Sequence, residues 1–417
     1  MIFFFLLVYN FLFVLVLPLV VIILLISNKY RKEVFYKLFE RFAICNSLNK
    51  TAKKTLWIHC ASLGEVRVVE TILENFEEEY FVVLTSVTKS AREYAQKLQK
   101  VNFVTLLPLD IYPIMHKTFN VIKPDLLILI ETELWINMLY IAFRNDVKVI
   151  LVNARMSDAS FKMYKRLKFF WNKFVGLISV VVARNKEDAE KFKFLTTGKT
   201  KIVVSGNIKY DRNFILNSTR KDFFLKNEDF VFTAGSTRNG EEKFIANVYN
   251  KISFVCTNVK FFVAPRHLSR IKNVVKILDG SDVKYSLFSK GDFKNNFILV
   301  DVFGKLQNIY SVSDICFLGG SIVKKGGQNP IEPAAYGKPI LFGRNMNNFK
   351  SESEILIKFG GALIVKDVDD VVEKICKFIY DKSLIRKVGQ NALRAVTSQK
   401  GSLAFTLKEI KEILDGQ

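Results

Sequence analysis

The sequence predicts an α/β protein with two doubly wound, Rossmann-like domains that face a cleft, behind an N-terminal membrane anchor. Apolar runs of strand length alternate with amphipathic stretches of roughly ten to fifteen residues, which is typical of βα units in a parallel sheet. This series starts afresh near residue 230, which predicts a second domain. The chain has 417 residues, 50% of them hydrophobic, and is long enough to bury two cores.

Residues 1–28 are expected to form the anchor. Residues 1–27 carry no charged side chain, and about 20 apolar residues suffice to cross a bilayer. The segment lacks the basic start and small-residue cleavage site of a signal peptide. The basic residues that follow at once predict a single-pass anchor with the rest of the chain in the cytoplasm; they are Lys29, Arg31, Lys32 and Lys37. Tilted or interfacial insertion is the alternative, and Pro18 can kink the helix.

The predicted domains are residues 29–212 and 213–417, because the stretch 206–225 turns polar and loses its periodicity. Strands are expected in the first domain at 56–60, 81–85, 103–107, 126–130, 147–152 and 178–183. In the second domain they are expected at 230–235, 259–264, 283–288, 297–301, 314–320 and 338–343. Ligands in such sheets bind beyond the carboxyl ends of the strands, so that edge is the expected active site.

Composition limits the class of partner. The formal net charge of +22 implies an anionic partner, which is a nucleic acid, a membrane surface or a phosphorylated substrate. The lysines and arginines are spread over most of the length and form no long basic tract, so we expect no nucleic-acid binding. Neither a disulfide framework nor a metal site is expected, because the cysteines and histidines are scattered. They are Cys45, Cys60, Cys256, Cys316, Cys376, His59, His116 and His267.

Two acidic positions follow predicted strands in the first half. Glu65 begins a helix after the strand 56–60, where it can act as a general base or merely complement the helix dipole. Glu131 and Glu133 lie in the segment ETELWIN, directly after the buried strand 126–130. Carboxylates at such a place are costly to bury without partners, so a functional role is as well supported as a cap.

Three segments in the second half of the sequence are suited to binding an anionic group. The turn TAGSTRNGEE (233–242) exposes backbone N–H groups suited to a phosphate or carboxylate, although for this segment taken alone helix capping is the better explanation. Arg266, in APRH, can grip a phosphate or carboxylate with two hydrogen bonds. The glycine-rich segment 317–332 enters a helix at Asn329-Pro330 and predicts a nucleotide site, although it matches neither the Walker loop nor the dinucleotide fingerprint.

Taken together, these segments resemble the 3-deoxy-D-manno-octulosonic acid (Kdo) transferases of lipopolysaccharide assembly. The resemblance runs from the anchor to about residue 395. It rests on HCASLGEV, LPLD, ETELWIN, NARMS, GNIKYD, GSTRNGEE, APRH, GGSIVKKGGQNPIEPAAYGKP and NNF. Nine matches in the same order are far more specific than any one of them.

The resemblance implies a GT-B glycosyltransferase of the inner membrane that transfers Kdo from CMP-Kdo to a lipid A precursor, lipid IVA, with inversion. The GT-B analogy also implies that the stretch from about 385 to 417 is helical and packs back across the first domain. It implies that Glu65 is the proton acceptor and that Glu131 and Lys209 stabilise the transition state. The implied CMP-binding residues are Pro265, Arg266, Phe303, Gly304, Lys305, Asn329, Pro330, Ile331 and Glu332. The donor leaves as a monophosphate, so neither a metal nor another cofactor is expected.

The chain departs from the family pattern at four positions. Gln328 and Arg238 stand where the family has histidine, Lys305 replaces an acidic residue, and Ile136 replaces a proline. These changes leave two alternatives open, a GT-B enzyme that uses another nucleotide sugar and a catalytically silent nucleotide-binding relative. The number of Kdo residues transferred, the acylation of the acceptor and the oligomeric state have no signature in the sequence.

Overall fold

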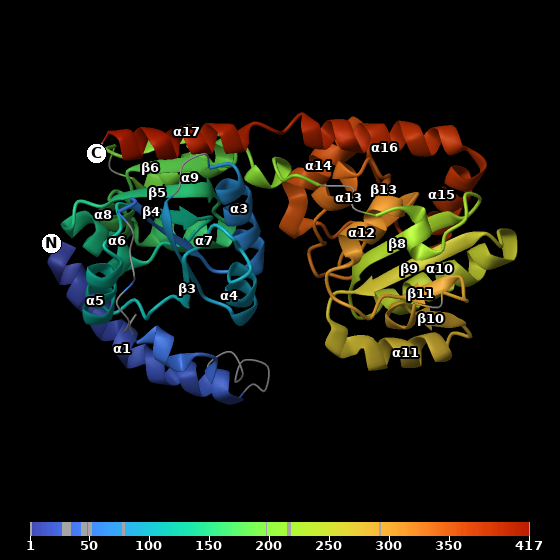
Figure 1. The fold of residues 1–417 in the computed structure, drawn as a ribbon, viewed down its shortest axis with the longest axis horizontal. Coiled ribbons are helices and arrows are strands. Elements are labelled where there is room, and N and C mark those ends of the chain that lie inside the picture. Colours follow the sequence, from blue (N-terminus) through green and yellow to red (C-terminus); the bar gives the residue numbers. More distant parts are fainter. Residues whose placement is uncertain are drawn as a thin grey trace. The chain divides into compact units, whose positions relative to one another are not determined.

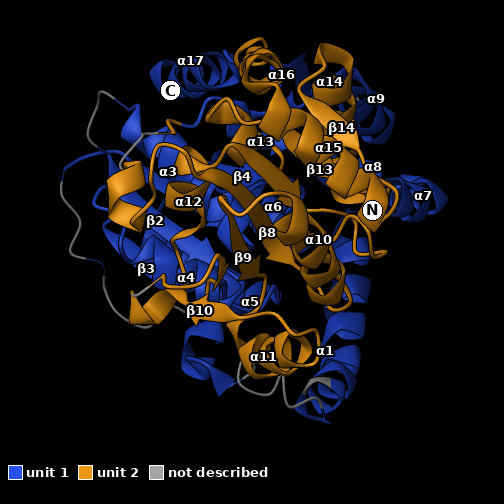
Figure 2. Ribbon diagram, turned by 90° about the vertical axis from the view of Figure 1, so that its right-hand side faces the viewer, with its two compact units in different colours: residues 1–212, 400–417 blue, residues 213–399 orange. Residues whose placement is uncertain are grey.

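The computed structural model describes residues 2–26, 35–42, 48, 52–76, 80–196, 198–214, 218–291 and 293–416. Lys29, Arg31 and Lys32, which carry the orientation prediction, and Cys45 lie outside these residues. Contacts divide the chain into two units, which are coloured separately in Figure 2. Unit 1 comprises Met1–Arg212 and Lys400–Gln417, and unit 2 comprises Asn213–Gln399.

Unit 1 is built on a parallel sheet of seven strands in the order β3-β2-β1-β4-β5-β6-β7 (Figure 1). The strands are β1 (Thr55–Cys60), β2 (Phe81–Ser86), β3 (Phe103–Leu106), β4 (Leu126–Ile130), β5 (Lys148–Ala154), β6 (Val180–Ala183) and β7 (Lys201–Val204). The helices are α1 (Ile2–Ile26), α3 (Leu63–Glu74), α4 (Lys89–Ala95), α5 (Tyr112–Ile122), α6 (Ile136–Arg144), α7 (Asp158–Arg166), α8 (Lys168–Val175), α9 (Lys186–Leu195) and α17 (Ser402–Asp415). Short 3₁₀ turns are η1 (Leu38–Arg41) and η2 (Ile208–Tyr210).

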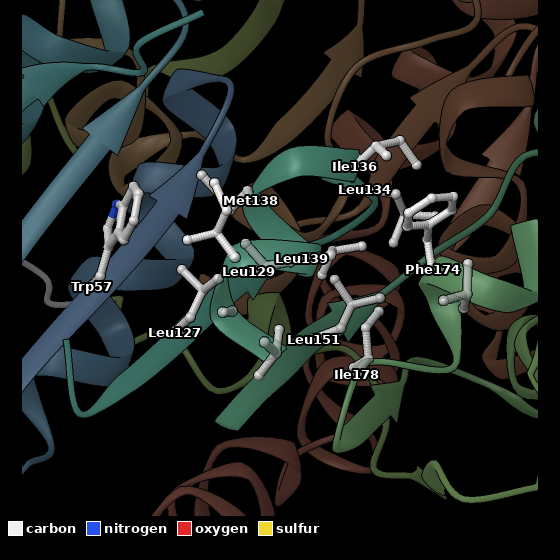
Figure 3. Packing of buried hydrophobic residues seen from close by; sticks show 14 of the residues in the cluster. Trp57, Leu127, Leu129, Leu134, Ile136, Met138, Leu139, Leu151, Phe174 and Ile178 are labelled. Atoms are coloured by element: carbon white, nitrogen blue, oxygen red, sulfur yellow. The ribbon is translucent and has the colours of Figure 1, made fainter. Parts of the chain in front are cut away.

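Both faces of this sheet are buried, because successive residues of a strand point to opposite sides. In β4, Leu127 and Leu129 join one core cluster while Leu126, Ile128 and Ile130 join the other. Figure 3 shows the first cluster, with Trp57 of β1 and Leu127 of β4 near Met138 of α6, and Phe174 of α8 near Ile136 at the other side of the view. Continuous apolar strands therefore form the middle layer of the unit.

Unit 2 repeats this plan with the order β10-β11-β9-β8-β12-β13-β14. The strands are β8 (Phe230–Thr237), β9 (Val259–Pro265), β10 (Tyr285–Leu287), β11 (Phe297–Leu299), β12 (Ile315–Leu318), β13 (Ile340–Phe342) and β14 (Ala362–Ile364). The helices are α10 (Glu241–Val255), α11 (Ile271–Asp279), α12 (Leu306–Val312), α13 (Ile331–Ala335), α14 (Lys350–Phe359), α15 (Val368–Tyr380) and α16 (Lys382–Thr397). The 3₁₀ turns are η3 (Arg220–Phe223), η4 (Leu268–Arg270), η5 (Phe288–Lys290) and η6 (Asn347–Phe349). The predicted fold class, two Rossmann-like α/β domains, is confirmed.

The C-terminal helix differs from the predicted domain division. The predicted boundaries place all of 213–417 in the second domain, whereas residues 400–417 belong to unit 1, which agrees with what the GT-B analogy implies for the C-terminal stretch. The physical reason is that α17 is amphipathic and buries Leu403, Ile410 and Leu414 in the second core cluster of the first sheet. The backbone N–H groups of Gly401 and Leu403 also donate to the carboxylate of Asp211, at 2.6 and 2.9 Å.

Helix α1 is long and apolar enough to cross a membrane. Its segment Ile2–Ile23 has a mean hydropathy of 2.9, and only 6% of its most apolar window is buried against the protein. These properties fit the predicted anchor.

Candidate active site

The first candidate site lies at the point where the strand order of unit 1 reverses. β1 and β4 are neighbours in the sheet although they are not consecutive in sequence. The connections that follow them leave toward opposite faces, and this opens a crevice at their carboxyl ends. Glu65 follows β1 and Glu131 follows β4, so the topology brings these two predicted residues to the same crevice.

Glu65 lies in the first turn of α3 and is 8% exposed. Its carboxylate accepts hydrogen bonds from the backbone N–H of Ala61 at 2.6 Å and from the hydroxyl of Ser62 at 2.7 Å. Burial raises the pKa of Glu65, and the negative charge of Glu131 raises it further, against the lowering effect of these two hydrogen bonds. A carboxylate held in place with a raised pKa is a suitable general base.

Glu131 is paired with Lys209, the third predicted catalytic residue. The Lys209 Nζ lies 2.7 Å from the Glu131 Oε1. Burial alone would raise the pKa of Glu131, but Lys209, Arg184 and Arg155 together hold it below its ordinary value. Glu131 has a φ of 62°, a left-handed conformation that costs about 1 kcal/mol or more in a residue with a side chain. Such strain is found at sites where the direction of a side chain matters.

Glu133 is held by two aromatic neighbours. The indole N–H of Trp135 donates to its Oε2 at 2.9 Å, and His59 Nε2 lies 3.3 Å from the same oxygen. His59 is fully buried, and its Nδ1 lies 3.0 Å from the hydroxyl of Thr85. His59 and Trp135 therefore position Glu133 from beneath the site.

A cavity of about 260 Å³ opens between these carboxylates. It is lined by Glu65, Glu131, Thr132, Glu133, Arg155, Ser157 and Ser160. A larger, shallower hollow of about 590 Å³ lies between α7 and α9, where Lys191 is already paired with Asp158 and Glu187. None of the predicted residues lines that hollow, so the chemistry is assigned to the smaller cavity.

The lining from 155 to 160 was not predicted. Arg155 follows β5, and Ser157 caps α7 by accepting from the backbone N–H of Ser160 at 3.1 Å. The available signal was the motif NARMS directly after a strand, since β5 pairs with β4 and their carboxyl ends meet at one edge. Among the residues that the structure describes, no group of His, Cys, Asp or Glu is arranged to hold a metal ion.

The second candidate site lies at the equivalent reversal in unit 2, between β8 and β12. The buried Glu241 at the start of α10 organises the glycine-rich loop after β12. Its carboxylate accepts from the backbone N–H groups of Gly320, Ser321 and Ile322 at 2.6, 3.0 and 3.1 Å, and from that of Arg238 at 2.9 Å. This acidic residue is therefore structural, which supports the capping interpretation of GSTRNGEE.

The loop is also fixed by close backbone approaches. A Cβ on Gly319 would lie 2.4 Å from the carbonyl oxygen of Ser236, and one on Gly327 would lie 2.3 Å from the sulfur of Met346. Gly326 accepts from the backbone N–H of Asn348 at 2.9 Å, which connects the loop to the NNF segment. Glycine is therefore needed at 319 and 327 because a side chain would not fit there, and not only because the chain turns.

The predicted CMP-binding residues come from three places in unit 2. Pro265 ends β9, and the exposed Arg266 follows it. Phe303, Gly304 and Lys305 are exposed and follow β11, the neighbour of β9 in the sheet. Asn329, Pro330, Ile331 and Glu332 form the start of α13, which packs against α12.

Within the last group, Asn329 organises the start of α13. Its Oδ1 accepts from the backbone N–H of Ile331 at 3.1 Å, and its Nδ2 lies 3.4 Å from Glu332. Of the departures from the family pattern, Arg238 lies 2.8 Å from the Nε2 of His267, and Lys305 precedes α12 with its side chain exposed.

Comparisons with known proteins fit this architecture. A sequence profile of the family described as 3-Deoxy-D-manno-octulosonic-acid transferase (kdotransferase) matches residues 36–212. A 3-deoxy-D-manno-octulosonic acid transferase of Rickettsia bellii is 30% identical over 98% of this chain and 96% of its own length. Another, of Aquifex aeolicus, is 31% identical over 84% of this chain and 93% of its own.

A solved glycosyltransferase from Rickettsia africae shares the fold, with a TM-score of 0.60 at 15% identity over 88% of this chain and all of that one. The two parallel sheets, each with a point where the strand order reverses, define the class of fold: two Rossmann-like domains of the type that this glycosyltransferase shares. The identity to the two transferases over nearly the whole chain then places the protein within that class. It belongs to the 3-deoxy-D-manno-octulosonic acid transferase family.

Proposed function

We propose that this enzyme transfers Kdo from CMP-Kdo to a hydroxyl of a lipid A precursor, lipid IVA, with inversion at the anomeric carbon. The observation that carries the proposal is the cavity of unit 1, where a carboxylate with a raised pKa lies beside a half-buried Lys–Glu pair. Membership of the family supports Kdo as the sugar that is transferred. The net charge of +22 supports a phosphorylated lipid as the acceptor, because a basic protein attracts anionic lipids.

In this mechanism Glu65 accepts the proton of the acceptor hydroxyl. The resulting oxygen nucleophile attacks the anomeric carbon of Kdo as the bond to the CMP phosphate breaks, so the electron pair of that bond leaves with CMP. Lys209, oriented by Glu131, supplies positive charge where negative charge develops. Arg266 and the backbone of the loops after β11 and β12 are assigned to hold CMP.

We further propose that the reaction needs no metal and that the enzyme acts on the cytoplasmic side of the inner membrane. A monophosphate leaving group has no diphosphate for a metal to bridge. The basic residues after α1 in the sequence support the cytoplasmic side.

The direct test is transfer from CMP-Kdo to a tetraacylated lipid A precursor by the purified enzyme, with and without EDTA. We expect product of the same yield in both, and the mass of the product gives the number of sugars added. An enzyme that binds CMP but makes no product would favour the silent relative. An enzyme that binds no CMP would overturn the donor assignment.

The pH dependence should report the state of Glu65. The base must be ionised, so kcat/KM should rise tenfold per pH unit below the pKa of Glu65 and level off above it. Because burial and Glu131 raise this pKa, the inflection should lie above the ordinary range of a glutamate. Glu131→Gln removes the like charge, and the inflection of its residual activity should move to lower pH. An unchanged inflection would remove Glu65 from the role of base.

Glu241→Gln tests the donor loop. A glutamine offers one acceptor oxygen in place of two and turns an N–H₂ group toward backbone donors, so unit 2 should lose about 2–4 kcal/mol of stability. Affinity for CMP should fall with it, because the loop after β12 loses its support. Thermal unfolding and calorimetric titration of CMP measure the two effects, and the exposed Glu228→Gln is the matched control. Unchanged stability and affinity would show that the loop holds its shape without Glu241.

A further inference from the structure

The first turns of α1 pack against unit 1. Leu6 is 3% exposed and belongs to the core cluster that also contains Trp57 and Phe119. Ile2, Phe5 and Tyr9 pack against the same cluster. One face of the first nine residues of α1 is therefore already covered by protein.

Polar contacts fix this packing. The hydroxyl of Tyr9 donates to Asp110 at 3.0 Å. The side chain of Asn10 accepts from the backbone N–H of Tyr112 at 2.8 Å and donates to Asn137 at 3.0 Å. Asp110 and Asn137 are buried, and Asp110 also accepts from the backbone N–H groups that begin α6. Tyr9 and Asn10 thus complete a polar network of the folded unit. Moving them into lipid would break these hydrogen bonds and bury unpaired polar groups.

This packing conflicts with a full crossing of the bilayer. A helix rises 1.5 Å per residue, so the segment 11–26 beyond the packed part is about 24 Å long, against roughly 30 Å of hydrocarbon. A crossing would require residues 2–10, which are held by unit 1, to enter the membrane. Unit 1 would then have to follow them into the bilayer.

The uncovered face of α1 is apolar along its length and continues onto α7 and α8. Exposed side chains of α1 include Phe3, Phe4, Leu7, Phe11, Leu12, Leu15 and Leu19. The ring of Phe5 lies 5.8 Å from that of Phe169, which is itself exposed. Figures 1 and 2 both show α8 beside the N-terminal end of α1.

Basic residues border this continuation. In the stretch 162–169, which we call the α7–α8 strip, Met163, Leu167 and Phe169 are exposed. Between them lie the exposed cations Lys162, Lys165, Arg166 and Lys168. An apolar surface edged by lysine and arginine matches the interface between acyl chains and anionic headgroups.

We infer that α1 lies in the plane of the membrane as a monotopic anchor, with both of its ends on the cytoplasmic side, and that the α7–α8 strip rests on anionic headgroups beside it. This arrangement replaces the single crossing expected from the sequence. The inference rests on the proposed function only in taking the membrane to be the inner membrane. Its tests do not measure Kdo transfer. An in-plane anchor places unit 1 directly on the surface from which a lipid acceptor is taken.

Protease access to an epitope tag at the N-terminus separates the two topologies. In-plane insertion predicts that the tag is digested in inverted inner-membrane vesicles and protected in intact spheroplasts. A crossing helix predicts the reverse. Digestion in spheroplasts, or protection in both preparations with digestion only after detergent, would overturn the inference.

Cross-linking tests the packing itself in native membranes. Phe5→Cys with Phe169→Cys should be joined by a short bismaleimide, and mass spectrometry of the peptides separates this link from the natural cysteines. Leu19→Cys with Phe169→Cys is the matched control, because position 19 lies about 21 Å further along the helix and should not react. Absence of the 5–169 link, or equal yields for both pairs, would overturn the packing of α1 on unit 1.

Charge reversal tests the α7–α8 strip. Lys165→Glu, Arg166→Glu and Lys168→Glu together should weaken binding to vesicles of phosphatidylethanolamine with phosphatidylglycerol several-fold, and the loss should shrink in high salt. The same reversal at the exposed Lys382, Arg386 and Lys387 changes the net charge equally and should have little effect. Equal losses in the two triple variants would show a general charge effect and overturn the assignment of the strip.

Discussion

Glu65→Gln is expected to lower the rate of Kdo transfer by about 10²- to 10⁴-fold, the usual contribution of a general base. Glutamine is isosteric and can still accept a hydrogen bond from Ala61 or Ser62, so the turn between β1 and α3 should keep its shape. The affinity for CMP should not change, because the residues assigned to CMP lie in unit 2. Single-turnover transfer and calorimetric titration of CMP measure these two quantities.

The matched control is Glu74→Gln, an exposed glutamate in the last turn of the same helix, which should be fully active. Stability gives a second readout. A carboxyl group whose pKa is raised in the fold contributes stability at low pH and loses it as the pH rises through that pKa. Compared with Glu65→Gln, the wild type should therefore become relatively less stable as the pH rises. Retention of more than a tenth of the transfer rate by Glu65→Gln would assign the base to another residue.

Sequence patterns predicted the central strands well because these are continuous apolar runs buried on both faces. The short edge strands β7 and β14 were missed. In β7 no residue is fully buried, and β14 has three residues of which one is buried, so neither gives a long apolar run. The predicted domain boundaries put the C-terminal helix in the wrong unit for a related reason, and only the GT-B analogy implied that it packs across the first domain. Its amphipathic pattern predicts a buried face but cannot say which sheet covers that face.

The position of a candidate site residue was predictable where the residue follows a strand within a distinctive motif, as for Glu65 and Glu131, which line one cavity. Its supporting residues were less predictable. The role of Glu241 depends on backbone N–H groups some 80 positions later in the chain, such as that of Ser321. The same holds for His59, which reaches Glu133 across 74 positions because β1 and β4 are neighbours in the sheet. Contacts of this kind follow from strand order, which the local pattern does not contain.

The contact between α1 and unit 1 shows the same limit. Composition marks residues 1–27 as a candidate membrane segment, but hydropathy averages over the helix and hides its two polar residues. Tyr9 and Asn10 have meaning only once Asp110 and Asn137 are seen opposite them. A sequence profile therefore predicts a crossing helix where the folded unit holds the first turns at its own surface.

Lys209→Ala should lower transfer by about 10²- to 10³-fold, because it removes a positive charge aimed at the reacting centre. It also leaves the half-buried Glu131 without its nearest partner. The positive charges of Arg155 and Arg184 remain near Glu131. The side chains of Lys209 and Glu131 are themselves partly exposed, so the loss of stability should be modest, about 2 kcal/mol near neutral pH. The exposed Lys186→Ala is the control for loss of a lysine from this unit.

The double variant Lys209→Ala/Glu131→Gln separates the two roles of the pair. In the wild type the lowered pKa of Glu131 contributes stability above the pKa of the unfolded chain, and this contribution is lost as the pH falls through the folded pKa. The difference in stability between Lys209→Ala and wild type should therefore disappear in acid. At neutral pH, Glu131→Gln should restore the stability of Lys209→Ala by removing the unpaired charge, while transfer remains low. Recovery of transfer together with stability would mean that Lys209 serves only to neutralise Glu131, and its assignment to the transition state would be wrong.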